Sequence, residues 1–180
     1  MLKYIQPYRW ALLPIAFALA ILPACFLGLL IVKYSVNVPF QDQWAIARLL
    51  PKWVEGTLSF GDLIAQHNES RKFFPRLIFL ALAQFTHWDV RYEMLISFLL
   101  ACIVAVNLYR LSHLTVGSSL LQGLFLAAIA NLIIFSPVQW DNWLWGIQVV
   151  VFIPIACITT AISVCYSQLS LNTKFGICLG

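Results

Sequence analysis

The sequence predicts an all-α, polytopic membrane protein with about four transmembrane helices and with interfacial helices in a large first external loop. Three observations lead to this fold class. Hydrophobic residues make up 62% of the 180 residues and charged residues only 10%, whereas soluble domains are about a quarter charged. Four apolar segments are long enough to cross a bilayer core of about 30 Å. Most of the charged residues lie between the first two of these segments.

The four predicted spans belong to a single membrane domain, 1–180. The first span is preceded by Lys3 and Arg9 and contains LPAC at 22–25, features that are also found in secretion signals. Its apolar run continues past Cys25 to Val32, which is too long for a signal peptide, so we interpret it as an uncleaved anchor. The predicted spans are 11–32, 92–109, 118–138 and 147–166. Three polar residues within them are expected to hydrogen-bond between helices: Asn107, Gln122 and Asn131.

The segment 33–91 is predicted to be the external loop. Its first apolar tract, 44–54, mixes Trp and Leu with cations, and Pro51 is expected to kink or end the helix. The second tract, 73–85, would cover only about 20 Å as a helix, so it is predicted to be interfacial or re-entrant. The distribution of positive charges alone does not decide the orientation of the chain.

Composition also excludes several classes of protein. The net charge of +4 is modest and there is no basic run, so no nucleic-acid partner is expected. The five cysteines lie in or beside apolar segments without a CxxC spacing. We therefore interpret them as small apolar residues and not as disulfide or zinc ligands.

Two segments of similar composition follow apolar runs, VPFQDQW (38–44) and PVQWDNWLWG (137–146), and each places one Asp among Trp, Gln and Pro. Asp42 has two interpretations, a general base or ligand of a divalent metal, and the N-cap of a helix that begins at Gln43. Asp141 is either part of the same site or a hydrated acid in a turn. If the N-terminus is cytoplasmic, both lie at the external side, where they can share one site and, if there is a metal, bind it together. Trp140, Trp143 and Trp145 are expected in the interfacial belt, with stacking on a sugar as the alternative.

The loop also carries three cations within six residues, Arg71, Lys72 and Arg76. They suit the phosphate of a substrate, or equally the headgroups of membrane lipids. His67 and Glu69 lie just before them and either assist proton transfer or are solvated loop residues.

The order of these features resembles the N-terminal part of the GT-C superfamily of membrane glycosyltransferases, which includes the protein O-mannosyltransferases and the lipid A aminoarabinose transferase. VPFQDQW stands where that family has its first acidic motif, and HNESRKFFPRL (67–77) stands where it has a His-Pro-Pro stretch. The segment 91–111 is similar to the second span with its cytoplasmic Arg, and 131–143 to the third span with the second acidic motif. The resemblance covers nearly the whole chain and rests on order and spacing.

The resemblance implies a glycosyltransferase that takes a sugar from a polyprenyl-phosphate donor at the external face of the plasma (inner) membrane of a bacterium. Membrane lipids and this donor would be its partners. Gln43 follows Asp42 where the family often has Glu, the His-Pro-Pro is absent, and the family has more spans. We therefore expect an N-terminal portion of a longer protein, inactive by itself. The resemblance implies the catalytic residues Asp42 and Asp141 and the substrate-binding residues His67, Glu69, Arg71, Lys72 and Arg76.

A second hypothesis is a small non-enzymatic membrane protein, such as a transporter or an assembly subunit, or an inactive remnant of the enzyme. In that case the polar loop binds a partner, and the same charged residues serve recognition instead of catalysis.

Overall fold

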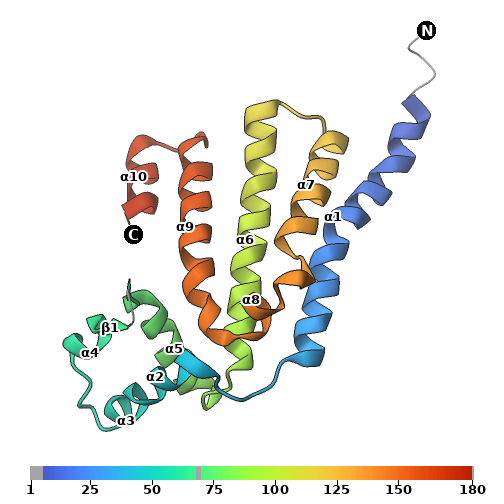
Figure 1. Ribbon diagram of the computed structural model, residues 1–180. Coiled ribbons are helices and arrows are strands. Elements are labelled where there is room, and N and C mark those ends of the chain that lie inside the picture. Colours follow the sequence, from blue (N-terminus) through green and yellow to red (C-terminus); the bar gives the residue numbers. More distant parts are fainter. Residues whose placement is uncertain (1–5, 68–69, 180) are drawn as a thin grey trace. The chain divides into compact units, whose positions relative to one another are not determined.

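The computed structural model describes residues 6–67 and 70–179, and nearly all of its regular structure is helical (Figure 1). The longer helices are α1 (Gln6–Tyr34), α5 (Phe73–Thr86), α6 (Arg91–Val116), α7 (Leu120–Ile134), α9 (Val149–Cys165) and α10 (Leu171–Leu179). The short elements are η1 (Gln41–Gln43), α2 (Trp44–Ala47), α3 (Leu49–Val54), α4 (Phe60–Ile64), η2 (Pro137–Gln139), α8 (Trp140–Leu144) and η3 (Gly146–Gln148). Two strands of two residues each, β1 (Gln66–His67) and β2 (Ser70–Arg71), form an antiparallel pair.

Four segments of the described chain are long and apolar enough to cross a membrane, and each overlaps one of the four predicted spans. This confirms the all-α polytopic membrane fold. Prolines inside α1 and α9 are tolerated, as expected for helices whose neighbours can satisfy the freed carbonyl groups. The four segments are Ala11–Tyr34, Arg91–Val116, Leu120–Leu144 and Gly146–Cys165.

The second and third spans differ in detail from the prediction. Helix α6 continues beyond residue 109 to Val116, so Arg110, which was expected just after the span, lies inside the helix. The turn is made by Gly117, whose φ of 61° is the left-handed conformation that commonly ends a helix. Ser119 then caps α7 by accepting a hydrogen bond from the backbone N–H of Gln122. The third span is interrupted, because α7 ends at Ile134 and η2 and α8 follow it.

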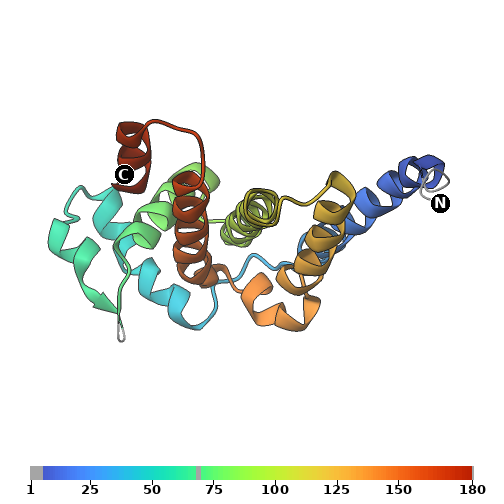
Figure 2. The ribbon, with the colours of Figure 1, turned by 90° about the horizontal axis from the view of Figure 1, so that it is seen from above.

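The chain divides into two compact units, the first of which comprises 1–30, 100–138 and 154–180. Figure 2 looks along α6 and shows α7 on one side of it and α9 on the other. Asn131 Nδ2 donates to the carbonyl of Ala20 at 2.7 Å, and Asn107 Nδ2 donates to Thr160 Oγ1 at 2.8 Å. These bonds join α7 to α1 and α6 to α9, as predicted for both asparagines. The prediction for Gln122 is wrong, since its side-chain oxygen accepts from the backbone N–H of Ser119 in its own helix cap.

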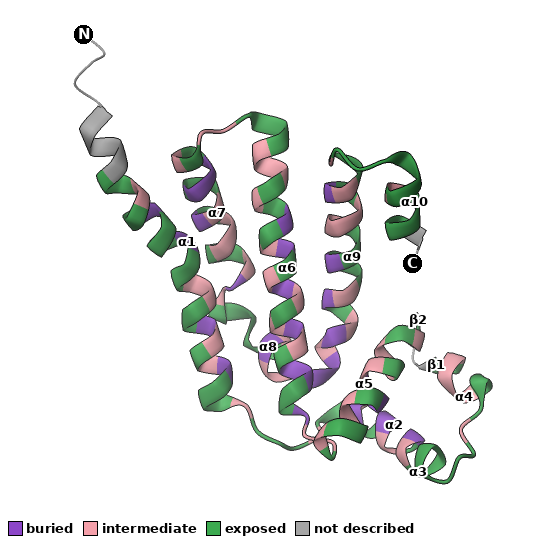
Figure 3. Ribbon diagram, turned by 180° about the vertical axis from the view of Figure 1, so that it is seen from behind, coloured by how far each residue is buried: buried purple, intermediate pink, exposed green. Residues whose placement is uncertain are grey.

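The interface between α1 and α7 contains small residues, which let two helices approach closely. Its buried members are Ala16, Ala20, Leu124 and Ala128. Large apolar side chains of α1, among them Phe17 and Leu22, are exposed. Figure 3 shows that much of α1 is coloured as exposed. Exposed apolar surface of this extent is typical of a helix that meets lipid.

The second unit comprises 31–99 and 139–153 and contains the predicted loop. The helix expected over 44–54 is broken at Arg48, three residues before Pro51. The break has a steric reason, because a proline ring clashes with the carbonyl four residues earlier, here that of Ala47. Helix α5 has 14 residues, about 21 Å, and it buries Phe79 and Leu80 while Phe74 is exposed. It ends at Thr86, and its C-cap His87 has a φ of 54°.

Candidate functional site

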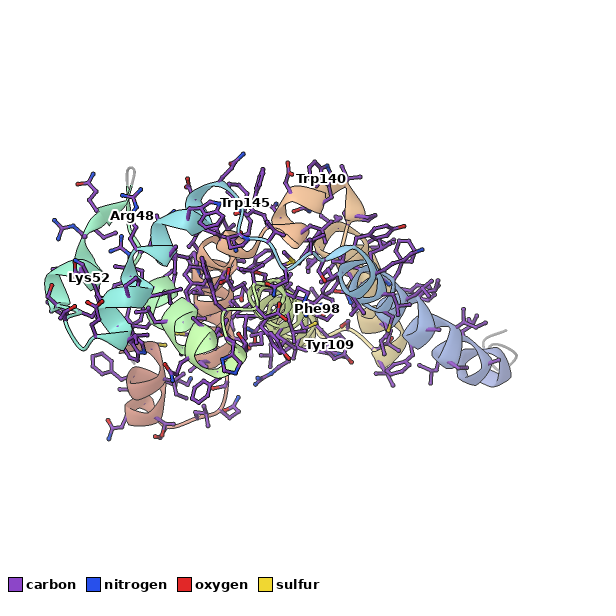
Figure 4. The ribbon with its side chains drawn as sticks, turned by 90° about the horizontal axis from the view of Figure 1, so that it is seen from below. Arg48, Lys52, Phe98, Tyr109, Trp140 and Trp145 are labelled. Carbon is purple, nitrogen blue, oxygen red and sulfur yellow. The ribbon has the colours of Figure 1, made fainter. Side chains whose placement is uncertain are left out.

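The two segments of similar composition meet in the second unit. The rings of Phe40 and Trp145 pack edge to face, with their centroids 5.8 Å apart. Trp145 Nε1 donates a hydrogen bond to the carbonyl oxygen of Phe40 at 3.2 Å. Figure 4 labels Trp145 just after α8 and Trp140 at its start. Aromatic packing and a backbone hydrogen bond therefore join VPFQDQW to WDNWLWG, over a separation of about 100 residues along the chain.

Asp42 lies in the middle of the short turn η1 and is partly buried. The interpretation of Asp42 as an N-cap is wrong, because the cap of η1 is Phe40 and the cap of α2 is Gln43. Gln41, directly before it, has a φ of 44°. A left-handed conformation costs a non-glycine residue about 1–3 kcal/mol, so the surrounding structure has to impose this turn.

Asp42 lines a cavity of about 20 Å³ together with the predicted cations Lys72 and Arg76. The remaining walls are apolar and are formed by Ala45, Ile46, Phe79 and Ile147. This volume admits about one water molecule, whereas pockets for small organic ligands have about 300 Å³ or more. The cavity thus suits a water molecule or a single oxygen of a larger group, and a sugar phosphate would require it to widen.

Arg76 has a structural role that the sequence did not indicate. Its Nη1 donates to the carbonyl oxygens of Asp62, Leu63 and Ala65 at 3.0, 2.8 and 2.7 Å. These carbonyls lie at the C-terminal end of α4, where a helix has unpaired acceptors and a partial negative charge. Burial lowers the pKa of the Arg76 guanidinium, and the nearby Asp62 opposes this shift. Arg76 therefore brings its positive charge to the cavity while it holds α4 in place.

The other predicted substrate residues are distributed around the β1–β2 pair. Lys72 immediately precedes α5 and is partly buried at the cavity, whereas Arg71 is exposed in β2 and is not among the cavity residues. The backbone of His67 pairs with Ser70, but its side chain lies outside the described part of the structure. Glu69 lies outside the described residues altogether.

Asp141 lies in the first turn of α8 and is exposed. It is not one of the residues that line the cavity of Asp42, so the structure joins the two segments without bringing both acids to this cavity. Within 6–67 and 70–179, no three His, Cys, Asp or Glu side chains are grouped in a way that could hold a metal ion. Trp140 is exposed, as an interfacial residue should be, but Trp143 is buried against Phe152 and belongs to the core instead.

Sequence reasoning did not single out Glu93, which is the most deeply buried acid among the described residues. It is only 1% exposed, and its Oε2 accepts a hydrogen bond from Nε2 of Gln43 at 2.6 Å. Gln43, also 1% exposed, directly follows Asp42 in the chain. The available signal was a carboxylate at the start of an apolar span, where an ionisable residue is costly and is usually functional.

The fold and the site together define an α-helical integral membrane protein whose second unit contains a partly buried acid beside two cations. A comparison of the chain with protein-family models, curated proteins and solved structures finds no match.

Proposed function

We propose that the chain is a GT-C-like glycosyltransferase, or the N-terminal portion of one, that takes a sugar from a polyprenyl-phosphate donor. The observation that carries the proposal is that Asp42, Lys72 and Arg76, from two separate segments, line one cavity. An acid beside two cations is the arrangement that this transfer requires, since one group accepts a proton and the others hold a phosphate. The order of motifs along the chain supports the same reaction, at the external face of a bacterial plasma (inner) membrane.

In this reaction the acceptor oxygen forms a bond to the anomeric carbon while the bond from that carbon to the phosphate oxygen breaks. The acceptor proton goes to the carboxylate of Asp42, and polyprenyl phosphate leaves. Lys72 and Arg76 bind the phosphate oxygens and offset the negative charge of the leaving group. Asp141, which is exposed and does not line the cavity, would have to move toward Asp42 for the two acids to share a divalent metal. Arg71, His67 and Glu69 contact the donor when the cavity widens around it.

The test of this proposal is Asp42→Asn in the full-length protein. The amide keeps the size of the side chain but does not accept a proton at neutral pH, so we expect sugar transfer to fall by about 100-fold or more. Glu55→Gln is the matched control, because Glu55 is an exposed carboxylate of the same unit and should tolerate the change. The measurement is the release of polyprenyl phosphate in membranes that contain each variant, detected by mass spectrometry.

Lys72→Met separates donor binding from turnover. Loss of a charge that holds the phosphate in the ground state should raise the KM for the donor more than it lowers kcat. Lys72 is the better choice than Arg76, because Arg76 also binds three carbonyls of the α4 end. Unchanged release in Asp42→Asn would remove Asp42 from the reaction and with it the basis of the proposal.

The non-enzymatic alternative is favoured by one observation, the volume of about 20 Å³, which does not accommodate a sugar. A small membrane subunit would use Asp42 and the cations to recognise a partner and would release no polyprenyl phosphate under any of these conditions. Absence of release in the unsubstituted full-length protein, tested with the lipid pool of its own cells, would decide for this alternative.

A further inference from the structure

Glu93 is a buried acid that the proposed reaction does not use. It lies in the first turn of α6 and is 1% exposed. A carboxyl group in such a place is costly unless its oxygens are hydrogen-bonded. The structure supplies a donor, the side-chain amide of Gln43, at 2.6 Å.

Gln43 is engaged at both ends of its side chain. Its Nε2 donates to Glu93, and its Oε1 accepts the backbone N–H of Phe40 at 2.9 Å. The second bond closes the turn Phe40–Gln43, and Asp42 lies inside this turn. The first bond anchors the turn to α6. A second anchor runs in parallel, since Asn37 Oδ1 accepts the N–H of Val90 at 3.0 Å.

The third side of this arrangement is the backbone of Gly146. A Cβ atom at this residue would overlap with Glu93 Oε2 and would lie 2.5 Å from Gln43 Nε2. Neither side chain has room to withdraw easily, because both are buried. Glu93 and Gln43 thus pack directly against the residue that begins η3, and Ile147 of the same turn lines the cavity of Asp42.

We propose that Glu93 is a positioning residue: by accepting the amide of Gln43 it holds the η1 turn, and with it Asp42, at the cavity of Lys72 and Arg76. What Glu93 supplies is an acceptor oxygen, so a neutral amide at the same place serves equally well. The importance of this for catalysis rests on the function proposed above, but the positioning itself is independent of any activity and is tested without one.

The experiment measures how fast a cysteine in the η1 turn reacts with a sulfonated methanethiosulfonate reagent. The full-length protein, with its native cysteines replaced and with Asp42→Cys, is reconstituted in lipid nanodiscs. Glu93→Leu removes the acceptor, loosens the turn and should raise the labelling rate by about tenfold or more. Glu93→Gln retains an acceptor oxygen and should change the rate by less than about twofold. Glu55→Leu, which removes an exposed carboxylate of the same unit, should leave it unchanged.

Two further variants address the partner of Glu93. Gln43→Met removes the same hydrogen bond from the other side, and its combination with Glu93→Leu should label no faster than the faster single variant. The exchange Gln43→Glu with Glu93→Gln preserves both hydrogen bonds and should label at the parental rate. A parallel series of the same variants carries Leu80→Cys instead of Asp42→Cys as a control for the fold. Leu80 is buried in α5, so this cysteine must stay unreactive in every variant that is compared.

The outcomes are distinct. An unchanged rate in Glu93→Leu overturns the proposal, and so does a Glu93→Gln protein that labels as fast as Glu93→Leu, because the charge and not the acceptor would then matter. If Leu80→Cys becomes reactive in the Glu93→Leu background, the fold itself is damaged in that variant. The proposal is then judged from the other two variants: Gln43→Met should label faster than the parent protein, and the exchange variant should label at the parental rate. A confirmed labelling pattern in a protein that releases no polyprenyl phosphate would retain the positioning role and reject the proposed function.

Discussion

Gly146→Ala tests the packing of η3 against the buried pair Glu93 and Gln43. The added Cβ would lie 3.0 Å from Glu93 Cβ and 2.5 Å from Gln43 Nε2, both shorter than ordinary carbon contacts. The two polar side chains cannot both keep their places, so we expect the bond between them to break. Leaving a buried donor and acceptor without their hydrogen bond costs about 1–3 kcal/mol, and overpacking adds about 1–3 kcal/mol.

The expected total is therefore about 3 kcal/mol or more in the free energy of unfolding. For a chain of this size each kcal/mol lowers Tm by about 2–4 °C, so Gly146→Ala should melt about 6–12 °C below the parent protein. The assay is thermal unfolding of the detergent-solubilised protein, followed through tryptophan fluorescence. The chain has seven tryptophans, of which Trp143 and Trp145 lie just before Gly146.

Two other glycines are matched controls for the same substitution. Gly176 lies in α10 with nothing within 4 Å of an added Cβ, so Gly176→Ala should leave Tm unchanged or raise it slightly. Gly117 also has open space but a φ of 61°, so Gly117→Ala should cost only the strain of the left-handed conformation, about 1–2 kcal/mol. If Gly146→Ala melts within error of Gly176→Ala, the packing argument for Glu93 and Gln43 is refuted.

Three shorter predictions concern other parts of the molecule. Asn131→Leu removes the bond to Ala20 and should destabilise the α1–α7 pair by about 0.6 kcal/mol, the average for such bonds in membranes, measurable by the same melting assay. Hydrogen bonds from Lys52 and then Ser59 hold the pKa of Asp62 well below its usual range, so this carboxylate stabilises the fold above its unfolded pKa of about 4, and the stabilisation is lost as pH falls further. Melting at pH 3 relative to pH 5 should therefore drop less in Asp62→Asn than in the parent, and an equal drop contradicts this. Reporter fusions at Gly56 and Thr86, on either side of α5, should report the same compartment, since α5 is too short to cross, and a fusion at Gly117, after α6, should report the other one; opposite reports at Gly56 and Thr86 would mean that α5 also spans.

Much of the candidate site was predictable from residue types and spacing. The sequence identified Asp42 and a cluster of cations in one loop between two spans but did not predict that they meet, and the structure shows Asp42, Lys72 and Arg76 lining one cavity. The reason is local, since Lys72 and Arg76 are one helical turn apart at the start of α5 and come to the same face. Sequence alone did not distinguish Arg71 from Lys72 and Arg76, although Arg71 is exposed and does not line the cavity. Arg71 lies in a strand of two residues, which is too short for its alternation of side-chain directions to be recognised in the sequence.

The role of the second acidic segment was less predictable. Its likeness to the first segment suggested that the two acids converge, whereas the contacts are made by Trp145, Gly146 and Ile147, and Asp141 is exposed. Charge and composition identify which segments carry polar chemistry. They do not say which side chain of a five-residue helix points inward, because that depends on where the helix starts, here at Trp140.

The sequence by itself determined the class of this protein, the number and order of its spans and the region that carries its charges. These properties follow from the free energy of transferring each segment between water and lipid, which is nearly a sum over residues and can be read along the chain. Only the tertiary structure decided that Gln43 binds Glu93 across 50 residues, that Gly146 packs against both side chains, and that Arg76 binds the C-terminal carbonyls of α4. Those contacts depend on the distance and direction of single donor and acceptor atoms, and a hydrogen bond is lost within an ångström of displacement. No periodicity or composition encodes such distances, so they exist only once the chain has folded.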